Sequence, residues 1–407
     1  MTFDELYHTM LRQNPAGGPI LDADPHHLDC LLHPERYPPV LHIASCDPCK
    51  EDGACLRSCI FDAIVRRDDG SLSIDAERCA GCGACIDACQ NGNLTASRDI
   101  LPAMKAVREP GKHAYALIAP AFLGQFTEAV TPGKLRSAFK ALGFTGMVEV
   151  ALFADILTLK EALEFDRNIV HDGDYQLTSC CCPMWIAMIR KIYHELMPHV
   201  PGAVSPMIAC GRVIKQLHPD AVTVFVGPCL AKKSEAREPD VAEAVDYVLT
   251  FQEMQDILEA AGIDPASLPE SEKDHSSRAG RIYARTGGVS EAVRKTVEQL
   301  SPDRVPAVRT RQADGVPACR AMIEELKNGT ADANFFEGMG CRGGCVGGPK
   351  AILDRETGRE LVDRYGEEAT YPTPLQNPYV MELLRRLGFE TVEDLLGHNT
   401  LFTRDFR

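Results

Sequence analysis

The feature that most constrains this chain is a concentration of cysteine near its N-terminus. Seventeen cysteines occur among 407 residues, and eight of them fall between residues 46 and 89. They form two runs, CDPCKEDGACLRSC and CAGCGACIDAC. Outside secreted proteins, so many cysteines serve as metal ligands or redox groups more often than as disulfides. The spacing within the runs therefore decides what this part of the chain folds around.

The second run has the spacing C-x2-C-x2-C-x3-C, which is typical of bacterial two-cluster ferredoxins. In such folds three thiolates of a run hold one 4Fe-4S cube, and the fourth cysteine ligates the other cube. The first run has three extra residues between its second and third cysteines, and neither run is followed by the usual proline. The predicted ligands are Cys46, Cys49, Cys55 and Cys89 for a first cluster, and Cys59, Cys79, Cys82 and Cys85 for a second cluster.

A pair of structural zinc sites, each joining a C-x2-C pair to a C-x3-C pair, is the alternative interpretation of these runs. Zinc sites use sets of four ligands, whereas the C-x2-C-x2-C triplet crowds three thiolates as a cube requires. The spacing therefore favours the clusters. Two cubes in one small module form a path for electrons and not a reaction site, so we expect the chemistry elsewhere in the chain.

Length and composition indicate a soluble protein of two or three domains, with 45% hydrophobic and 25% charged residues. The N-terminal segment MTFDELYHTM lacks the features of a signal peptide, and the apolar stretches are too short to cross a bilayer. We therefore expect a cytoplasmic protein that does not act on membranes. A net charge of -15 without a basic tract argues against nucleic acid as a partner and is compatible with a basic redox partner or a small substrate.

After residue 100 the pattern changes to alternating apolar and amphipathic segments. Residues 114–121, 146–153 and 221–229 are predicted strands, and residues 133–144, 155–165, 183–196, 287–300 and 315–329 are predicted helices. This alternation is typical of α/β domains, in which ligand-binding residues lie where strands give way to loops. A helix near the C-terminus, within YPTPLQNPYVMELLRRLG, would cover a lobe or a partner.

The remaining cysteines of interest follow such predicted strands. Cys180, Cys181 and Cys182 lie side by side in TSCCCPMW, Cys229 lies in GPCLAKKSEA, and Cys341 and Cys345 lie in EGMGCRGGCVGGPK. A thiol triplet points to metal ligation, redox exchange or proton transfer, because a core cysteine gains nothing from two identical neighbours. We expect Cys341 and Cys345 on one helical turn, among glycines that let the backbone approach a bulky cofactor. A phosphate-binding loop is a poorer match, since no Ser or Thr follows Lys350.

These three segments, in this order behind a two-cluster module, resemble the active-site signatures of the iron-only (FeFe) hydrogenases, and the triplet resembles the branch called group B. The resemblance implies a two-lobed α/β catalytic domain holding an H-cluster. That cofactor is a 4Fe-4S cube bridged to a diiron unit with CO, cyanide and azadithiolate ligands. It also implies domains at 1–40 (N-terminal cap), 41–100 (α+β ferredoxin-like), 101–365 (catalytic) and 366–407 (helical extension).

Carried over residue by residue, the resemblance implies Cys345 as the bridging ligand, with Cys341, Cys229 and one member of the triplet as the other cube ligands. Counting from Pro183, which would begin a helix, makes Cys182 the ligand and Cys181 the proton carrier. Counting from Thr178 shifts both roles back by one residue. We prefer the proline anchor, because a helix start holds a ligand rigidly while the extra residue bulges in the loop.

The resemblance also implies a proton path through Glu161 and Glu164, which lie at i and i+3 on one helix face. A solvated acidic helix face is the common alternative for such a pair. The family places a serine between these glutamates, and a gapless count puts Pro201 there. Proline carries no proton, so the path would need water or another route.

Four further residues match cofactor contacts of the family. Lys232 matches a lysine that pairs with a cyanide ligand, and we expect Glu235 to orient it by an ion pair. Met339 matches a methionine packed on the diiron unit, and Ser205 matches a serine before proline. Gly227 stands where the family has methionine, which predicts open space beside the diiron site.

The sequence thus predicts a hydrogenase that interconverts H2 with protons and electrons and exchanges electrons with ferredoxin or a similar carrier. Dedicated maturation enzymes would insert its diiron unit. A slow-turnover redox or H2 sensor is one alternative, and a noncatalytic iron-sulfur carrier similar to eukaryotic assembly proteins is another. Cys345, Lys232 and the thiol triplet favour the enzyme over the carrier.

Overall fold

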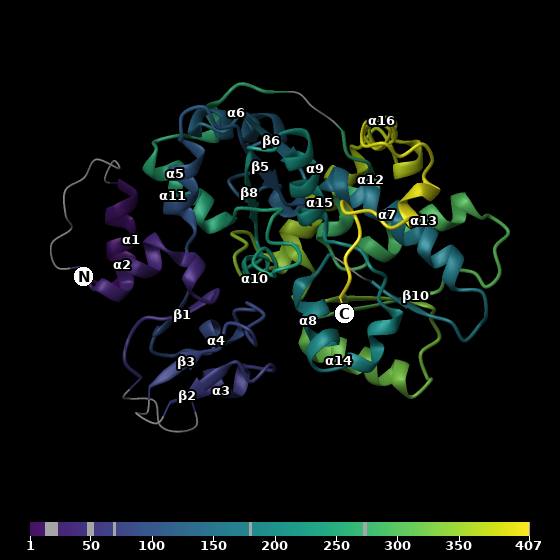
Figure 1. Cartoon of the computed structure of the whole chain (residues 1–407), viewed down its shortest axis with the longest axis horizontal. Helices are drawn as coiled ribbons and strands as arrows, with labels where there is room; N and C mark the ends of the chain where they lie inside the picture. Colours follow the sequence, from purple (N-terminus) through teal and green to yellow (C-terminus); the bar gives the residue numbers. More distant parts are fainter. Residues whose placement is uncertain (13–22, 47–52, 68–70, 179–180, 272–274, 407) are drawn as a thin grey trace.

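A computed structural model describes residues 1–12, 23–46, 53–67, 71–178, 181–271 and 275–406 (Figure 1). Its strands are β1 (Val40–His42), β2 (Ile64–Arg66), β3 (Leu72–Ile74), β4 (Leu94–Ala96), β5 (Ala114–Ile118), β6 (Gly146–Glu149), β7 (Gln176–Leu177), β8 (Val222–Gly227), β9 (Tyr247–Thr250), β10 (Thr310–Asp314) and β11 (Phe335–Met339). None of its helices combines the length and the apolar character of a membrane span within these residues.

The helices are α1 (Phe3–Arg12), α2 (Pro25–Leu32), α3 (Ala54–Ser58), α4 (Ala84–Asp87), α5 (Ile100–Val107), α6 (Pro132–Leu142), α7 (Ala151–Asn168), α8 (Pro183–Lys191), α9 (Pro206–Leu217), α10 (Ala231–Glu235), α11 (Phe251–Ala260), α12 (Arg278–Arg281), α13 (Gly288–Leu300), α14 (Val316–Lys327), α15 (Arg355–Glu367) and α16 (Pro378–Arg386). Their ends follow local chemistry. Thr131 caps α6, for example, and Gly143 ends it with a φ of 107°.

The ferredoxin-like part consists of two small antiparallel strand pairs and two short helices. β1 pairs with β4, and β2 pairs with β3. α3 carries Cys55 and α4 carries Cys85. Figure 1 places these elements together below α1 and α2, which pack against α11 and α5 of the rest of the molecule. Tyr7 fixes this contact, since its buried hydroxyl donates to Asp256 Oδ2 at 2.8 Å.

The first lobe of the α/β part is a four-stranded parallel sheet in the order β6-β5-β8-β9. All six residues of β8 are buried, as expected for a central parallel strand. The carboxyl end of β6 leads into α7, and that of β8 leads to Cys229. The predicted site residues of this lobe therefore follow strand ends, as the general rule for such sheets requires.

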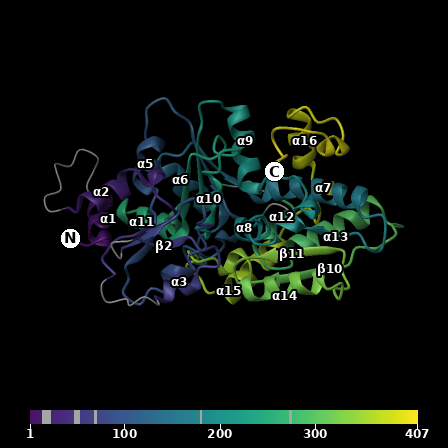
Figure 2. The same cartoon turned by 60° about the horizontal axis from the view of Figure 1, so that its bottom comes forward.

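The second lobe is a three-stranded parallel sheet in the order β10-β11-β7. α13 and α14 pack on it, and α8 packs against β11. β7 leads to the thiol triplet, and β11 leads to Cys341. Figure 2 shows α14, β10 and β11 layered at one side of the molecule, away from α9 and α16. The predicted two-lobed α/β domain behind an α+β ferredoxin-like module is thus the observed architecture.

Several predicted boundaries are wrong; the predicted strand 114–121, for example, ends at Ile118, before a 3-10 turn at Pro120–Phe122. The strand predicted over 146–153 ends at Glu149, and Ala151 already belongs to α7. Fourteen of the eighteen residues of α7 are buried, so this helix lacks the polar stripe that would distinguish its start from a buried strand. The helix predicted over 183–196 ends at Lys191, where a short 3-10 turn (His194–His199) takes over.

The C-terminal extension is tied to the core through a buried carboxylate. Asp155 of α7 accepts hydrogen bonds from the backbone N–H groups of Ser277 and Gly280, at 2.7 and 2.8 Å, and from the amide of Asn377 at 3.4 Å. Burial raises the pKa of Asp155 to about 6, and the hydrogen bonds oppose this rise. Asn377 caps α16, and α16 also packs against α7, so the extension lies on α7 of its own chain.

Candidate functional site

The cysteines of the second cluster lie together around α4. Burial, with smaller contributions from thiolates at Cys82, Cys79 and Cys59, raises the pKa of Cys85 to about 12. The pKa of Cys79 rises to about 11 for the same reasons, burial first and then Cys82 and Cys59. Cys59 comes from the first run, so this grouping is the crossed one typical of two-cluster ferredoxins.

The first-cluster residues that the structure describes also gather. Burial raises the pKa of Cys55, and charges at Cys89 and Cys46 add to the rise. Cys46 Sγ lies 3.0 Å from His42 Nε2 and 3.7 Å from Asn93 Nδ2. Cys49, the fourth predicted ligand, lies outside the described residues. Sequence analysis did not single out His42 or Asn93, because a single polar side chain on a short strand carries no pattern.

Four further cysteines converge between the two lobes. Burial, with smaller contributions from thiolates at Cys229 and Cys182, raises the pKa of Cys345 to about 12. The pKa of Cys341 is raised well above its usual value, again by burial and then by Cys229, Cys182 and Cys345. Buried thiols that disfavour one another's ionisation fit a site in which a metal cluster takes up the negative charge. This donor set therefore fits a cube.

The thiol triplet is divided by the start of α8. The helix begins at Pro183 with Cys182 as its N-cap residue, and Cys182 Sγ accepts a hydrogen bond from Gly340 N at 3.2 Å. Cys182 thus joins the group formed with Cys229, Cys341 and Cys345. Cys181 is half-buried and packs in the apolar cluster that contains Met339. Cys180 lies outside the described residues.

Trp185 of α8, the only tryptophan of the chain, connects the triplet loop to β11. Its indole N–H donates to the carbonyl of Thr178 at 3.2 Å, and its ring lies over Gly338 of β11. A Cβ at Gly338 would come within 2.1 Å of that ring, so the close packing requires glycine. Met339, the next residue, is 1% exposed. The ring therefore fixes the triplet loop to the strand that leads to Cys341.

The two glutamates of the predicted proton path are buried, which excludes the solvated helix face. Glu161 is 1% exposed and Glu164 is 5% exposed. Burial raises the pKa of Glu164, and its buried ion pair with Lys160 opposes that rise. Lys160 was not among the predicted residues, because a lysine beside two glutamates resembles surface sequence. Gln176 of β7 donates to the carbonyl of Glu161 at 3.4 Å, which connects α7 to the strand before the triplet.

The ion pair predicted between Lys232 and Glu235 is present. Lys232 Nζ lies 2.6 Å from Glu235 Oε2, and both side chains are buried. Burial alone would lower the pKa of Lys232, but Glu235 and then the thiolates of Cys229 and Cys345 raise it above its usual value. A charged lysine therefore faces the thiols that would hold the cofactor.

The expectation of open space at Gly227 is wrong. A Cβ at this position would lie 2.7 and 2.8 Å from two ring atoms of Phe225 and 3.0 Å from Ala119 Cβ. The Phe225 ring occupies the direction in which a side chain at Gly227 would point. Phe225 and Gly227 share a face of β8 because they are two residues apart in the strand, but the direction of the Phe225 ring depends on its rotamer, which the sequence does not give.

Replacing Gly227 with alanine is expected to lower the free energy of unfolding by about 1–3 kcal/mol, since overpacking forces the Phe225 ring to move. Denaturant unfolding of the protein would measure the change. In a Phe225→Leu background the same glycine replacement should cost much less, because the ring is gone. Equal costs in both backgrounds would contradict the steric account.

The glycine-rich loop differs from its predicted form. Cys341 and Cys345 do not share a helical turn, because Gly343 and Gly344 between them have φ values of 82° and 85°. A Cβ at Gly344 would lie 2.7 Å from Thr286 N, so this glycine lets the loop press against another segment of the chain. The close packing around the cysteines is therefore a contact within the protein.

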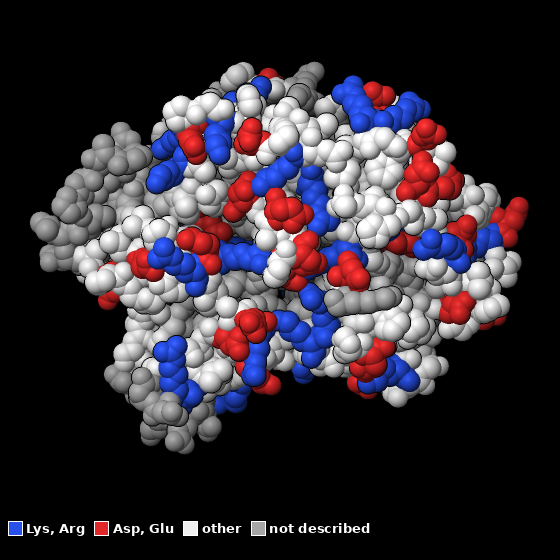
Figure 3. Space-filling view, viewed as in Figure 1, with Lys and Arg blue, Asp and Glu red and all other residues white. Residues whose placement is uncertain are grey.

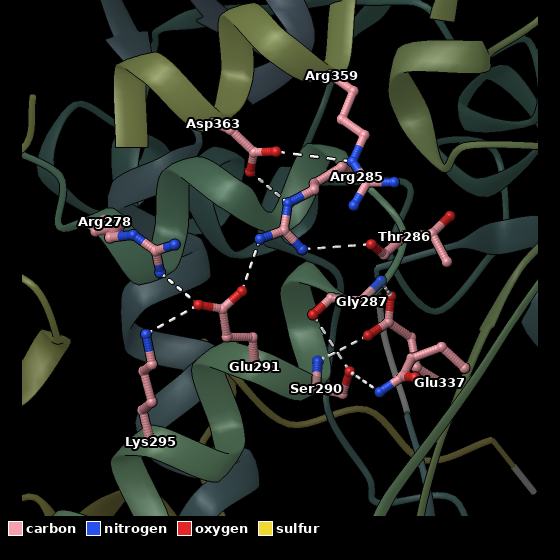
Figure 4. A network of polar contacts seen from close by, with 11 residues as sticks. Arg278, Arg285, Thr286, Gly287, Ser290, Glu291, Lys295, Glu337, Arg359 and Asp363 are labelled. Atoms are coloured by element: carbon pink, nitrogen blue, oxygen red, sulfur yellow. Dashed lines mark hydrogen bonds and ion pairs between the residues drawn. The ribbon is translucent and has the colours of Figure 1, made fainter. Parts of the chain in front are cut away.

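A polar network supports this loop, and Figure 4 shows its part around Thr286, Gly287, Ser290 and Glu337. Thr286 N donates to the carbonyl of Gly343 at 3.1 Å, and Asp314 Oδ2 accepts from both Gly343 N and Thr286 Oγ1 at 2.9 Å. Glu337 of β11 accepts from Gly287 N and Ser290 N at 2.7 Å. The network fixes the turn before α13 to β11 on one side and to the cysteine loop on the other. These residues carry no motif and were not predicted.

Ser205 caps α9, with its hydroxyl 3.4 Å from Ile208 N. This capping role accounts for a buried serine before proline at the start of a helix.

The second cysteine run adjoins the group of Cys182, Cys229, Cys341 and Cys345. A Cβ at Gly81 of this run would lie 3.0 Å from Ala231 Cα, two residues after Cys229, and a thiolate at Cys82 contributes to the raised pKa of Cys341. Ser234 of α10 donates to the carbonyl of Cys79 at 3.3 Å. The second cluster is therefore the nearer of the two to the catalytic group.

Comparisons with known proteins agree with this arrangement. A family model described as the C-terminal domain of the iron-only hydrogenase large subunit matches residues 112–349. A model described as a 4Fe-4S binding domain matches residues 72–95, which contain the second cysteine run. The two matches support 4Fe-4S clusters and an H-cluster as cofactors, against zinc in these runs.

Two curated relatives extend the likeness. The NADP-reducing hydrogenase subunit HndD of Solidesulfovibrio fructosivorans is 27% identical over 387 residues, covering 81% of this chain and 66% of the relative. Iron hydrogenase 1 of Clostridium pasteurianum is 28% identical over 368 residues, covering 68% of this chain and 64% of the relative. The chain thus spans slightly less than two thirds of the length of both.

The fold is shared with solved structures. A variant of the FeFe-hydrogenase HydA1 from Chlamydomonas reinhardtii superimposes with a TM-score of 0.62 at 22% identity, covering 75% of this chain and 98% of that chain. The hydrogenase model spans more than half of the chain, from before β5 to the loop after Cys345. The chain therefore belongs to the iron-only hydrogenase large-subunit family.

Proposed function

We propose that this chain is an FeFe-hydrogenase that catalyses reversible heterolytic H2 oxidation and proton reduction, and that its two 4Fe-4S clusters exchange electrons with ferredoxin or a similar carrier. The observation that carries the proposal is the convergence of Cys182, Cys229, Cys341 and Cys345 beside the buried Lys232. These residues come from both lobes, so the fold must be complete before the site exists.

In this proposal Cys182, Cys229, Cys341 and Cys345 hold the cube, and Cys345 also bridges to the diiron unit. When bound, the diiron unit supplies the metal centre at which the H–H bond is formed or broken. Lys232 offsets the negative charge of the cofactor and is itself held by Glu235. Met339 contributes apolar contact and keeps water from the site.

Protons would pass between the site and solvent through Cys181 and then Glu161 and Glu164. Cys181 is the neighbour of the ligand Cys182 and packs on the same apolar cluster as α7 residues Ala154 and Ala162. A relay of this kind requires side chains that hold protons at successive positions. The buried position of both glutamates supports the relay, while Pro201 means that the path needs water or another route at that point.

The first test is an infrared spectrum of protein loaded anaerobically with the complete diiron cofactor, in the region where metal-bound CO and cyanide absorb. We expect bands that shift under H2, together with H2 production from a reduced viologen dye. Bands without turnover would favour a sensor. If no bands appear, the hydrogenase proposal fails, and the chain is an iron-sulfur carrier.

Removing the contact between His42 and Cys46 is expected to lower the reduction potential of the first cluster. A ligand thiolate has no proton, so His42 Nε2 must donate the hydrogen bond at 3.0 Å, which stabilises the electron-rich reduced cluster. If the hydrogen bond stabilises the reduced cluster over the oxidised cluster by about 1 kcal/mol, its loss lowers the reduction potential by about 40 mV for a one-electron couple.

An EPR-monitored redox titration of the His42→Leu variant would measure this shift. The potential of the second cluster should not change and serves as the internal reference. The exposed His171, replaced in the same way, is the matched control. A first-cluster potential equal to that of the parent protein would show that the contact has no electronic effect.

A further inference from the structure

The side chains of Gln176 and Thr178, just before the thiol triplet, each contain a polar atom that no protein group satisfies. Gln176 is 3% exposed and Thr178 is 1% exposed. Gln176 Oε1 and Thr178 Oγ1 have no hydrogen-bond partner among the residues that the structure describes. Buried polar atoms of this kind are costly unless they bind water, and a buried water makes about three hydrogen bonds. The two atoms therefore mark a place where the fold holds ordered water.

Both side chains point from β7 toward α7. The backbone N–H of Thr178 donates to the carbonyl of Phe336 at 2.9 Å, so the strand pattern continues through Thr178. Residues two apart in a strand share a face, and Leu177 between them packs on the opposite side, in the apolar cluster around α8. Gln176 Nε2 donates to the carbonyl of Glu161 on α7 at 3.4 Å. The shared face of Gln176 and Thr178 therefore runs from α7 to the triplet loop.

The contact with Glu161 places the amide of Gln176 between the two glutamates of α7. The carbonyl groups of an α-helix point toward its C-terminal end, so the carbonyl of Glu161 lies at the level of the next turn, which carries Glu164. One oxygen of Glu164 binds Lys160. The other oxygen, Oε2, is buried and has no hydrogen-bond partner in the described part of the chain. Glu164 Oε2 is therefore a third buried atom that water can satisfy.

The position of the Lys160–Glu164 pair differs from that of many charged side chains of this chain. Figure 3 shows Lys, Arg, Asp and Glu side chains intermingled on the surface of one face of the molecule. The side chains of Lys160 and Glu164 are only 3% and 7% exposed. The positive charge of Arg167, an exposed residue one turn further along α7, also lowers the pKa of Glu164. Glu164 therefore lies between the buried residues of α7 and an exposed one.

We propose that Gln176 and Thr178 position ordered water in the proton path of the proposed hydrogenase. Water held by Thr178 connects Cys181 to Glu161, and water held by Gln176 connects Glu161 to Glu164. The second water takes the place of the serine that this chain lacks. Each step breaks one S–H or O–H bond and forms another on the next group, and no electron is exchanged. The inference rests on the proposed function and adds two positioning residues to its proton path.

A crystal structure of the protein with its 4Fe-4S clusters but without the diiron unit tests the water directly. We expect ordered waters within about 3 Å of Gln176 Oε1, Thr178 Oγ1 and Glu164 Oε2. The Thr178→Val variant should keep the fold and lose the water beside residue 178. If the parent structure has no water at Gln176 or at Thr178, the proposal is wrong, whatever the activity of the loaded protein.

Dye-driven H2 production by the loaded protein tests whether this water carries protons. Thr178→Val keeps the shape of the side chain and removes its hydroxyl. It should lower kcat about 10-fold and raise the solvent isotope effect, because one step of proton transfer loses its water. Thr178→Ser keeps the hydroxyl and should retain the parent rate. The control is Thr296→Val, since the Thr296 hydroxyl is also buried but donates to the carbonyl of Ala292 at 2.8 Å.

Two results of these rate measurements would overturn the proposal. Equal rates for Thr178→Val and the parent would show that the hydroxyl has no part in proton transfer. An equal fall in Thr178→Ser and Thr178→Val would show that the shape of the side chain matters and not its hydroxyl. A parent protein without infrared bands and turnover would instead overturn the proposed function, whereas the waters are observed without the diiron unit.

Discussion

Alanine at Cys182 is expected to abolish the cube of the catalytic site, whereas alanine at Cys181 should leave the cube in place and slow H2 production. Cys182 lies at the helix start with its sulfur directed to the group of Cys229, Cys341 and Cys345. Loss of a ligand removes a metal–sulfur bond that no neighbouring group replaces. Loss of a proton carrier typically costs about 100- to 10,000-fold in rate.

The measurement is iron content and EPR of each variant, followed by dye-driven H2 production. The first and second clusters should be retained in both proteins, which makes their EPR signals the control for folding. If Cys181→Ala loses the cube and Cys182→Ala keeps it, the family alignment counted from Thr178 is the right one. Cys180 would then be the proton carrier.

Methionine at Lys160 is expected to lower the free energy of unfolding by about 3–5 kcal/mol. Lys160 and Glu164 form an ion pair in which the side chains are 3% and 7% exposed. Removing one partner of a buried pair leaves the other charge without compensation, and this loss is the costly one. Replacing both residues with methionine should recover most of the stability, because two apolar side chains of similar volume carry no such penalty.

The stability deficit of Lys160→Met should also depend on pH. Burial raises the pKa of Glu164, and Lys160 opposes the rise, so the variant has a still higher folded-state pKa. A carboxyl whose folded pKa exceeds its unfolded value destabilises the fold when it is ionised. The deficit should therefore be full above the folded pKa and shrink as the pH falls through it. Denaturant unfolding at several pH values measures this, and a deficit independent of pH would contradict the assignment to Glu164.

The grouping of the cysteines was the most predictable part of this protein. Cysteine spacing predicts which sulfurs meet because the loops are short, and the structure brings Cys59 to the second run and Cys89 to the first. The order of strands and helices was also predictable where an element has one polar face, because the spacing of its polar residues then indicates whether it is a helix or a strand. Pro183 gave the start of α8 because proline suits the first turn of a helix.

Features that depend on packing between distant segments could not be predicted. The burial of Glu161 and Glu164 follows from α7 lying inside the fold, and an E-x-x-E pattern does not report on its surroundings. The filled space at Gly227 depends on the rotamer of Phe225, and the loop form of Cys341–Cys345 depends on Thr286 and Asp314.

The separation of the four catalytic cysteines along the chain has a consequence for the lifetime of the protein. A cube bound to Cys182, Cys229 and Cys341 closes loops of roughly 50 and 110 residues and joins the two lobes covalently. On the chain-entropy model, closing a loop of about 100 residues is worth about 4–5 kcal/mol. A chain without the cube has no such cross-link and opens more often, which exposes it to proteases. Its degradation rate would then distinguish polypeptides that have received their cofactor from those that have not.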